Sequence, residues 1–503
     1  MSLATIYSRA LVGVEAPLVT VEVHISGGLP ALSIVGLPEM AVRESKDRVR
    51  AALINANFEF PARRITVNLA PADLPKEGGR YDLAIALGIL AASKQLSVKH
   101  LHDYELVGEL SLGGELRAIR GSLPTALHCA SANRALILPA ANAAEAALAE
   151  SCPVLAANSL LEVCSHLNSQ AQLQFTETNR AEQQNEYELD WSEVKGQSQA
   201  KRALEIAAAG EHNLLMIGPP GTGKTMLASR LPTILPPLTQ AEAIESAALL
   251  SISNEPFDVA RWGQRCFRAP HHTASAAALV GGGSIPRPGE ISLAHHGVLF
   301  LDELTEYERR VLDVLREPME KGRISISRAA RQAEFPARFQ LIAAMNPCPC
   351  GYFGDVSGLC RCTAEQISRY RSKISGPVLD RIDMHIHVTR LPPALLNQTH
   401  VQNTETSRNV RERVLECRER QLQRNQCANA QLSHRQIKQY CALEDDSQQL
   451  LNVALEKLCL SARGYDRILK VARTIADLES SAQIQRQHIS EAIGYRALDR
   501  FVN

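Results

Sequence analysis

The sequence of 503 residues predicts a mixed α/β protein in which two α/β regions precede a helical region. Apolar and polar residues alternate over residues 19–25 and 65–69, as in strands with one buried face. Uniformly apolar runs at residues 214–217, 298–301 and 341–345 instead indicate buried strands. Runs of this kind are typical of a parallel sheet with helices on both faces.

Composition divides the chain into four segments. Gln, Asn, Thr and Glu dominate residues 168–189, where large apolar residues nearly vanish, so we assign this segment as a linker. It separates a first domain at residues 1–167 from a second at residues 190–391. A polar stretch with two prolines follows, and the pattern of residues 392–503 predicts a helical lid domain.

Charge and hydropathy exclude several classes of protein. Lys and Arg together number 54, as do Asp and Glu, so the chain is not a globally polybasic nucleic-acid binder. The charge balance does not exclude a local basic patch, because a patch acts through its own field. The longest apolar runs are too short for a membrane span, and the N-terminus lacks the layout of a signal peptide. We therefore expect a cytoplasmic protein without a membrane partner, in which clustered cysteines indicate metal or free thiols.

A glycine-rich turn follows the apolar run at residues 214–217. It fits the pattern G-x-x-x-x-G-K-[ST], with a predicted strand before it and a predicted helix after it. In this pattern backbone N–H groups surround phosphate oxygens, the lysine neutralises the β- and γ-phosphates, and the last hydroxyl binds Mg²⁺. The residues of this predicted nucleotide site are Gly218, Pro219, Pro220, Gly221, Thr222, Gly223, Lys224 and Thr225.

Two further apolar runs end in polar residues. Asp302 and Glu303 follow the run at 298–301; Asp302 is placed to hold Mg²⁺ together with Thr225, and Glu303 to polarise the attacking water. Asn346 follows the run at 341–345, where its amide could orient that water or contact the γ-phosphate. An Asp-Glu pair after an apolar run is a weak signal by itself, but downstream of a phosphate loop it is the expected second half of one site.

The segment between these motifs resembles a known family. The runs FRAPHH at 267–272, GGG at 281–283 and PRPGEISLAHHG at 286–297 are similar to the magnesium-chelatase-like branch of AAA+ ATPases. Within that branch the chain, from residue 1 to about residue 500, resembles the ComM/YifB family of competence-associated proteins. The resemblance implies a homo-hexameric ring that hydrolyses ATP with Mg²⁺.

The same resemblance implies roles for three polar residues. Asn346 corresponds to sensor 1, Arg381 in the run LDRID to the arginine finger that reaches the neighbouring subunit, and Arg463 in the run ARG to sensor 2. Chemistry favours an arginine from another subunit, because the transition state needs one more cation than Lys224 and Mg²⁺ supply. For Arg463 the alternative is a surface position at the start of a helix, with Arg467 as the nearest rival.

The first domain resembles the Lon-type protease domain through the runs PKEGGRYD and VGEL. In that domain a lysine of lowered pKa activates a serine nucleophile. Here the position of the serine nucleophile holds Arg80 and the position of the lysine holds Leu123. Neither can do the job, because a guanidinium stays protonated and leucine has no lone pair. We therefore expect a structural or ring-stacking module that is not a protease, with Ser122 and Lys76 as ordinary surface residues.

Four cysteines lie within fifteen residues shortly after Asn346. Their pattern is C-x-C…C-x-C, and four thiolates could close a tetrahedral Zn²⁺ site, although C-x-C is tighter than the usual C-x₂-C spacing. The sequence therefore predicts structural zinc, with four free thiols in a loop as the alternative. The residues are Cys348, Cys350, Cys360 and Cys362.

Basic residues gather between residues 321 and 338, where alternation predicts a β-hairpin with arginines near its tip. In the related ATPase branch this hairpin faces the pore of the ring. A second, glycine-rich insertion at residues 280–290 is a candidate pore loop. No aromatic residue lies at either tip, so interaction with a nucleic-acid backbone by charge is favoured over base stacking; the alternative is a solvated basic hairpin. The candidate DNA-binding residues are Arg287, Arg323, Arg328 and Arg331.

Three functions are compatible with these features. The resemblance favours a DNA translocase or helicase that promotes branch migration or unwinding during homologous recombination of incoming DNA in natural transformation, with DNA and recombination proteins as partners. A magnesium-chelatase-type ATPase subunit is the second possibility, but such motor subunits lack a fused Lon-like domain. An AAA+ protein remodeller is the third, and no aromatic pore residue of the kind that most remodellers use is evident here.

Overall fold

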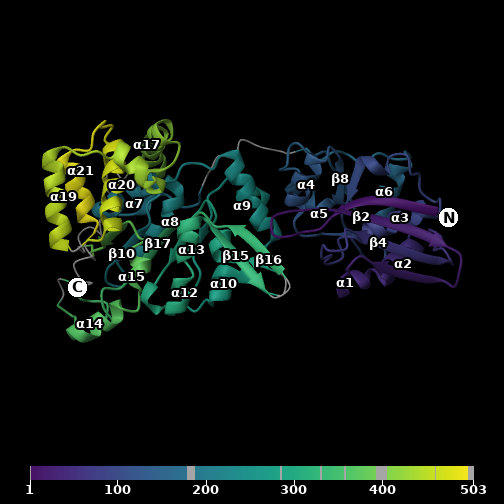
Figure 1. The fold of residues 1–503 in the computed structure, drawn as a ribbon, viewed down its shortest axis with the longest axis horizontal. Coiled ribbons are helices and arrows are strands. Elements are labelled where there is room, and N and C mark those ends of the chain that lie inside the picture. Colours follow the sequence, from purple (N-terminus) through teal and green to yellow (C-terminus); the bar gives the residue numbers. More distant parts are fainter. Residues whose placement is uncertain are drawn as a thin grey trace. The chain divides into compact units, whose positions relative to one another are not determined.

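The computed structural model describes residues 2–177, 187–283, 286–328, 331–355, 358–391, 405–458 and 460–496. Residues 178–186, which are much of the predicted linker, lie outside these ranges. So do residues 392–404, which are most of the polar stretch before the helical region. The chain forms two compact units: Met1–Gln183 with Ala243–Trp262, and Gln184–Glu242 with Gly263–Asn503. Figure 1 shows both units and labels those of their elements for which there is room.

The first unit is built on a seven-stranded mixed sheet of order β3-β4-β2-β1-β5-β8-β9. The alternating runs predicted as strands are confirmed as its β2 and β4, which pair antiparallel and bury every second side chain of β2. The strands are β1 (Ser2–Arg9), β2 (Leu18–Ser26), β3 (Ala31–Val35), β4 (Arg64–Ala70), β5 (Tyr104–Leu106), β8 (Ala135–Pro139) and β9 (Val154–Ala157), with a small separate pair β6 (Glu109–Leu110) and β7 (Leu116–Arg117).

Helix α3 (Asp82–Ala92) is the core of this unit, because all of its residues are buried. A helix that is apolar on every side is stable only when it is enclosed, and Gly88 lets it approach Val23 and Ile6 of the sheet closely. The other helices are α1 (Met40–Arg43), α2 (Ser45–Asn55), α4 (Ser122–Ser131), α5 (Ala140–Ala146) and α6 (Leu160–Leu167).

Residues 243–262 also belong to the first unit, although both flanking segments of the chain belong to the second. They contain most of helix α9 (Gln240–Ile252), whose Ala247 lies in one apolar cluster with Leu123 and Cys129 of α4. Trp262 packs against the same cluster. The first unit is therefore completed by a segment that the sequence places in the ATPase region.

The expectation that Lys76 and Ser122 lie at the surface is wrong, since both are fully buried. Lys76 Nζ donates a hydrogen bond to the carbonyl of Pro71, and burial lowers its pKa. Arg80 is also buried, and its Nη2 donates to Thr125 Oγ1 over 2.9 Å. Lys76 and Arg80 are therefore held inside the unit by neutral partners, which alternation and motif spacing do not reveal.

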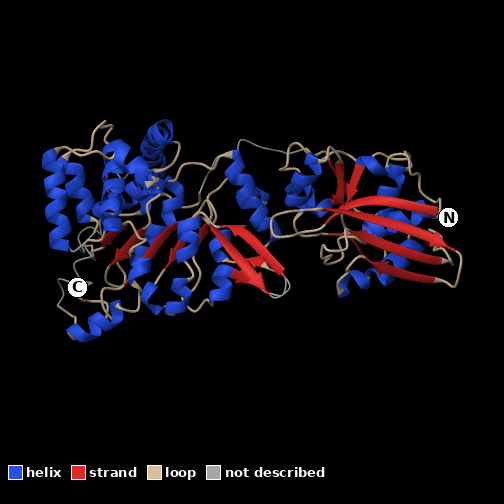
Figure 2. Cartoon of the chain, viewed as in Figure 1, coloured by secondary structure: helices blue, strands red, loops and turns tan. Residues whose placement is uncertain are grey.

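The second unit contains a five-stranded parallel sheet of order β11-β14-β17-β10-β18. The three uniformly apolar runs are confirmed as β10, β14 and β17, and each is buried along its whole length. Both sheets pack against helices (Figure 2). The strands are β10 (Leu214–Ile217), β11 (Phe267–Arg268), β14 (Val298–Leu301), β17 (Gln340–Met345) and β18 (Met384–His387).

Two short hairpins and several helices surround this sheet. The hairpins are β12 (Gly281–Gly282) with β13 (Arg287–Pro288), and β15 (Arg323–Arg328) with β16 (Arg331–Pro336). The helices are α7 (Ser198–Gly210), α8 (Lys224–Ile234), α10 (Ala276–Val280), α11 (Glu290–Leu293), α12 (Arg309–Asp313), α13 (Arg316–Lys321), α14 (Ala364–Arg371) and α15 (Gly376–Leu379).

The predicted helical region at the C-terminal end is confirmed. Its helices share one apolar core with α7, α8 and the parallel sheet, so this region is not separate from the second unit. In the described part of the chain no helix is long and apolar enough to cross a membrane. The helices are α17 (Ser407–Asn425), α18 (His434–Tyr440), α19 (Asp445–Leu458), α20 (Ala462–Leu478) and α21 (Arg486–Gly494).

Candidate nucleotide site and cysteine cluster

The glycine-rich turn connects the end of β10 to the start of α8. Gly221 and Gly223 have φ angles of 76° and 86°, a left-handed conformation that glycine adopts without steric cost. A Cβ atom at Gly218 would lie 2.2 Å from the carbonyl oxygen of Val388, the residue after β18, so only glycine fits there. The turn therefore has the backbone of a phosphate-binding loop at the N-terminus of a helix.

Lys224 is folded into this loop. Its Nζ donates hydrogen bonds to the carbonyl oxygens of Gly218 over 2.8 Å and Pro219 over 3.0 Å. Burial lowers the pKa of Lys224, whereas the charges of Asp302 and Glu303 act in the opposite direction. Phosphate oxygens are stronger partners for an ammonium group than loop carbonyls, so a bound nucleotide would replace these hydrogen bonds.

The carboxylates after β14 lie next to the loop. Asp302 Oδ2 accepts a hydrogen bond from Thr225 Oγ1 over 2.6 Å, which brings the two predicted Mg²⁺ ligands together. Glu303 has a φ of 49°, an uncommon conformation for a residue with a side chain. Its Oε2 lies 3.1 Å from Nδ1 of His272, a residue for which the sequence indicated no role beyond the FRAPHH motif.

Asn346 completes this group because β17 lies between β14 and β10 in the sheet. Its Oδ1 is 3.3 Å from Lys224 Nζ. The structure thus brings Lys224, Thr225, Asp302 and Asn346 together at the carboxyl ends of three neighbouring parallel strands. Crevices at this edge are where open α/β sheets bind their ligands.

Arg381 and Arg463 lie elsewhere. They line a cleft of about 830 Å³ together with Asn213, Gln340 and Asp383, which stand at the amino ends of β10, β17 and β18. These strands have four to six residues, so the two edges of the sheet are separated by about 13–20 Å. The two arginines and the phosphate loop of one chain therefore occupy opposite edges of the sheet.

Each of these arginines is paired with a carboxylate of its own chain. Arg381 forms an ion pair with Glu320 and donates to the carbonyl oxygen of Pro377 over 2.6 Å. Arg463 is 3.4 Å from Asp380, and its side chain is 63% exposed. Arg467, the rival candidate, is more enclosed and donates to Asp383 over 2.6 Å.

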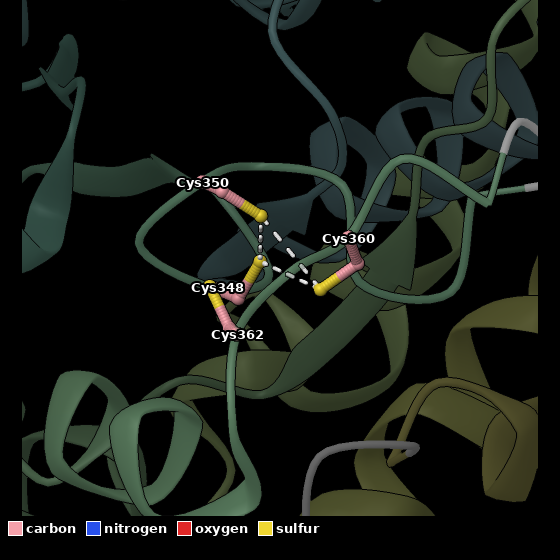
Figure 3. Close-up of side chains that lie close together, drawn as sticks. All are labelled: Cys348, Cys350, Cys360 and Cys362. Atoms are coloured by element: carbon pink, nitrogen blue, oxygen red, sulfur yellow. Dashed lines mark hydrogen bonds between the residues drawn. The ribbon is translucent and has the colours of Figure 1, made fainter.

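The cysteine cluster lies beside the phosphate loop. Cys348 follows Asn346 by two residues, and a Cβ at Gly351 would lie 2.7 Å from the ring of Pro220. The four sulfur atoms all lie within 4.8 Å of one another, and those of Cys348, Cys350 and Cys360 face each other in Figure 3.

The geometry of this cluster fits a tetrahedral metal. Three sulfur separations are 3.3, 3.7 and 3.8 Å. Tetrahedral Zn–S bonds of about 2.3 Å would set the sulfurs about 3.8 Å apart. Backbone N–H groups of Tyr352 and Arg361 lower the pKa of Cys350 to about 6, which favours a thiolate. The four cysteines would hold Zn²⁺, which would crosslink the loop without taking part in chemistry.

We expect purified protein to contain about one zinc per chain, because four converging thiolates bind this ion tightly. Changing Cys348 and Cys360 together to Ser should remove the metal and lower the midpoint of thermal unfolding. Cys266 and Cys427, which are partly buried outside the cluster, provide the matched control when changed to Ser. Elemental analysis that finds no metal in protein purified without chelators would contradict the zinc assignment.

The remaining cysteines are compatible with their predicted role as small core residues. Two are partly buried, Cys266 and Cys427; Cys459 lies outside the described residues. The fully buried ones are Cys129, Cys152, Cys164, Cys417 and Cys441.

The predicted basic hairpin is present as β15 and β16. Arg328 pairs in register with Arg331 next to the tip, while residues 329–330 and the side chains of both arginines lie outside the described part. Arg323 is not near the tip: it pairs with Pro336 at the base, and its guanidinium is 2.9 Å from Glu334.

The second hairpin packs against the first. A Cβ at Gly281 of β12 would lie 3.0 Å from Ile326 of β15. Arg287 lies in β13, and residues 284–285 of the connecting turn lie outside the described part. The two insertions that the sequence singled out are therefore in contact with each other at Gly281 and Ile326.

A phosphate loop after β10, an Asp-Glu pair after β14 and an Asn after β17, in a parallel sheet of this order, define a P-loop protein of the AAA+ type. Comparison with known proteins agrees. Sequence models described as magnesium chelatase, subunit ChlI, match residues 190–396, those described as subunit ChlI of Mg-chelatase match residues 21–142, and those described as its C-terminal part match residues 404–496.

Relatives match along the whole chain. The sequence is 53% identical to the uncharacterized protein YifB of Salmonella typhimurium, over 100% of this chain and 98% of the relative. It is also 53% identical to the competence protein ComM of Haemophilus influenzae, over 100% and 99% of the two chains. The 38 kDa subunit of the magnesium chelatase of Rhodobacter capsulatus is 25% identical over 59% of this chain and 84% of its own. The chain belongs to the ComM/YifB family of magnesium-chelatase-like AAA+ proteins.

Proposed function

We propose that this protein is an ATP hydrolase whose homo-hexameric ring moves on DNA and drives branch migration or unwinding during recombination of incoming DNA in natural transformation. The single observation that carries the ring is the separation of Arg381 and Arg463 from the phosphate loop across the sheet. A relative that is 53% identical is named a competence protein, which supports the biological context.

The residues at the carboxyl edge of the sheet fit the substrate ATP. Lys224 and the loop N–H groups would bind the phosphates, and Thr225 and Asp302 would hold Mg²⁺, which neutralises phosphate charge. Glu303 would accept a proton from the attacking water, and Asn346 would orient it. His272 holds the Glu303 carboxylate at 3.1 Å and would have to release it before it can act as a base.

The cleft at the amino edge supplies the missing cations. A guanidinium at the γ-phosphate accelerates hydrolysis strongly in P-loop enzymes, and a neighbouring subunit often provides it. Because Arg381 cannot reach Lys224 of its own chain, it would serve the phosphate loop of a second copy. Closed rings arise when such head-to-tail interfaces repeat around an axis.

The β15–β16 hairpin supports DNA as the moving ligand. Arg328 and Arg331 occupy paired positions in the register of the two antiparallel strands, so the sequence places two cationic residues beside the tip of the hairpin. A nucleic-acid backbone provides a series of anions that such residues can neutralise.

Magnesium chelation is the second candidate function, favoured by the 25% identity to a chelatase subunit. Proteolysis is not proposed, because the dyad positions hold Arg80 and Leu123, and the latter is fully buried.

The proposal is tested by the ATPase rate of the full-length protein without DNA and with single-stranded, duplex or branched DNA. We expect hydrolysis without DNA and a clear stimulation by single-stranded or branched DNA. Stimulation by a metalloporphyrin precursor, with no response to any DNA, would favour the chelatase-type function instead.

Changing Arg328 and Arg331 to Ala should weaken DNA binding and make it less dependent on salt. The log–log slope should fall by about one unit for each DNA phosphate that the variant no longer neutralises. Basal ATPase should largely survive, because neither residue is assigned to the nucleotide site, whereas DNA stimulation and strand displacement should collapse. Fluorescence anisotropy over a salt series gives the slope.

The matched control changes two exposed arginines of the helical region, Arg408 and Arg435, to Ala. It should preserve both slope and unwinding. Normal unwinding of branched DNA by the hairpin variant would show that the hairpin is only a solvated surface feature, and Arg287 of the neighbouring hairpin would become the candidate.

A further inference from the structure

The cleft that contains the arginines also contains both ends of the basic hairpin. Lys321 and Gly322 lead into β15, Arg338 and Phe339 lead from β16 to β17, and all four line this cleft. The base of the hairpin is closed by a hydrogen bond from the N–H of Ala337 to the carbonyl of Gly322 over 2.9 Å. A change in the cleft can therefore act on the base of the hairpin directly.

The ion pair between Arg381 and Glu320 joins the two features. Glu320 lies in the last turn of α13, two residues before Gly322. The Arg381 side chain is only 12% exposed, and its Nε atom has no hydrogen-bond partner among the described residues. Glu320 is thus the group that holds Arg381 against the hairpin base, while the second contact of the guanidinium, with the carbonyl of Pro377, lies within its own segment of the chain.

A phosphate group would compete with Glu320 for this guanidinium. Two anions that share one cation repel each other, and phosphate binds arginine strongly through paired hydrogen bonds. Gly322 supplies a joint on the side of Glu320 that faces the hairpin, since its φ of 66° is left-handed and its backbone ends α13. Loss of the ion pair would therefore free the end of α13 and the strand that follows.

We propose that Glu320 couples the nucleotide of one subunit to the hairpin of the next: phosphate entering the cleft from a neighbouring copy takes Arg381 away from Glu320 and releases the β15–β16 hairpin. This inference rests on the proposed ring, in which Arg381 serves a second copy of the chain. It assigns Glu320 as a positioning residue that touches neither nucleotide nor DNA.

The test uses the full-length assembled protein and the variant Glu320→Gln, which keeps the shape of the side chain but removes its charge. Glu317→Gln is the matched control, because Glu317 is on the same helix and pairs with exposed Lys321 over 2.9 Å. Arg381→Ala breaks the same ion pair from its other side. Amide hydrogen exchange of the described hairpin residues, with and without Mg²⁺ and AMP-PNP, reports release without requiring turnover or DNA.

In the unchanged protein AMP-PNP should raise exchange at the hairpin base. In Glu320→Gln and in Arg381→Ala exchange should already be high without nucleotide and should respond no further. The two variants should differ in ATP hydrolysis. Arg381→Ala should lose it, because the arginine itself is missing. Glu320→Gln should raise the basal rate about 1.5- to 5-fold, because Arg381 no longer has to leave an ion pair before it meets phosphate, and a half-exposed ion pair contributes a free energy in this range. Glu317→Gln should match the unchanged protein in every measurement.

Hairpin exchange in Glu320→Gln that equals the unchanged protein, with and without AMP-PNP, would overturn the coupling. Loss of turnover in Glu320→Gln, as in Arg381→Ala, would overturn it too, because Glu320 would then be needed for hydrolysis. Failure of the DNA function gives a different result. Amide hydrogen exchange at the hairpin base can respond to AMP-PNP and to Glu320→Gln as expected while no DNA stimulates ATP hydrolysis. In that case the coupling holds and the ligand of the hairpin is not DNA.

Discussion

Glu303→Gln is expected to abolish ATP turnover while leaving ATP binding intact. The amide keeps the size and hydrogen bonding of the side chain but cannot accept a proton from water, and removal of a general base typically costs a factor of about 100 to 10,000. Steady-state phosphate release should therefore fall at least about 100-fold. Titration with a fluorescent ATP analogue should give an affinity close to that of the unchanged protein.

Two further variants serve as controls, one that should lose nucleotide binding and one that should keep turnover. Lys224→Ala should lose nucleotide binding itself, because it removes the cation of the phosphate loop. Glu306→Gln should keep turnover, since Glu306 lies three residues further on and faces Lys373 at 3.6 Å. Hydrolysis near the unchanged rate in Glu303→Gln would show that the base has been assigned to the wrong carboxylate.

Arg381→Ala should also abolish turnover, and in a pure assembly the loss should reach about 1,000-fold or more, as for arginine fingers in other P-loop enzymes. Mixing these subunits with Lys224→Ala subunits should restore part of the activity. At some interfaces of a mixed ring an intact arginine then meets an intact phosphate loop. The ATPase rate plotted against mixing ratio should pass through a maximum.

Assembly of the mixtures is checked by native mass spectrometry, and Arg408→Ala controls for the loss of an exposed arginine. If the mixed rings form and no ratio restores hydrolysis, Arg381 does not act on a neighbouring subunit. The position of Arg381 at the opposite edge of the sheet would then need another explanation, such as a role in the ion pair with Glu320 alone.

The predicted strands and phosphate loop follow from local patterns. Alternation over residues 19–25 and the apolar run at 214–217 reflect how much of each strand is buried, and burial selects the residue types directly. Gly221 and Gly223 are required by left-handed backbone within the turn itself. Such constraints act over a few residues, so they can be read without the fold.

Several positions in both units were not predicted correctly or fully from local sequence patterns. His272 was visible in the FRAPHH motif, but nothing in the sequence paired it with Glu303, 31 residues further on. The burial of Lys76 and Ser122 was missed because surface positions are the common case for these residue types. Arg323 was grouped with the tip arginines by charge, whereas the hairpin register places it at the base.

The amino-acid sequence was enough to predict that Lys224, Asp302 and Asn346 follow strands of the parallel sheet, because strand, loop and helix signals are local. The three-dimensional fold was needed to show that Arg381 lies at the other edge of that sheet and forms an ion pair with Glu320, 61 residues earlier in the chain. The order of strands and the packing between distant segments set these distances. Neither leaves a periodic trace in the sequence, since any surface carboxylate would suit the pattern equally well.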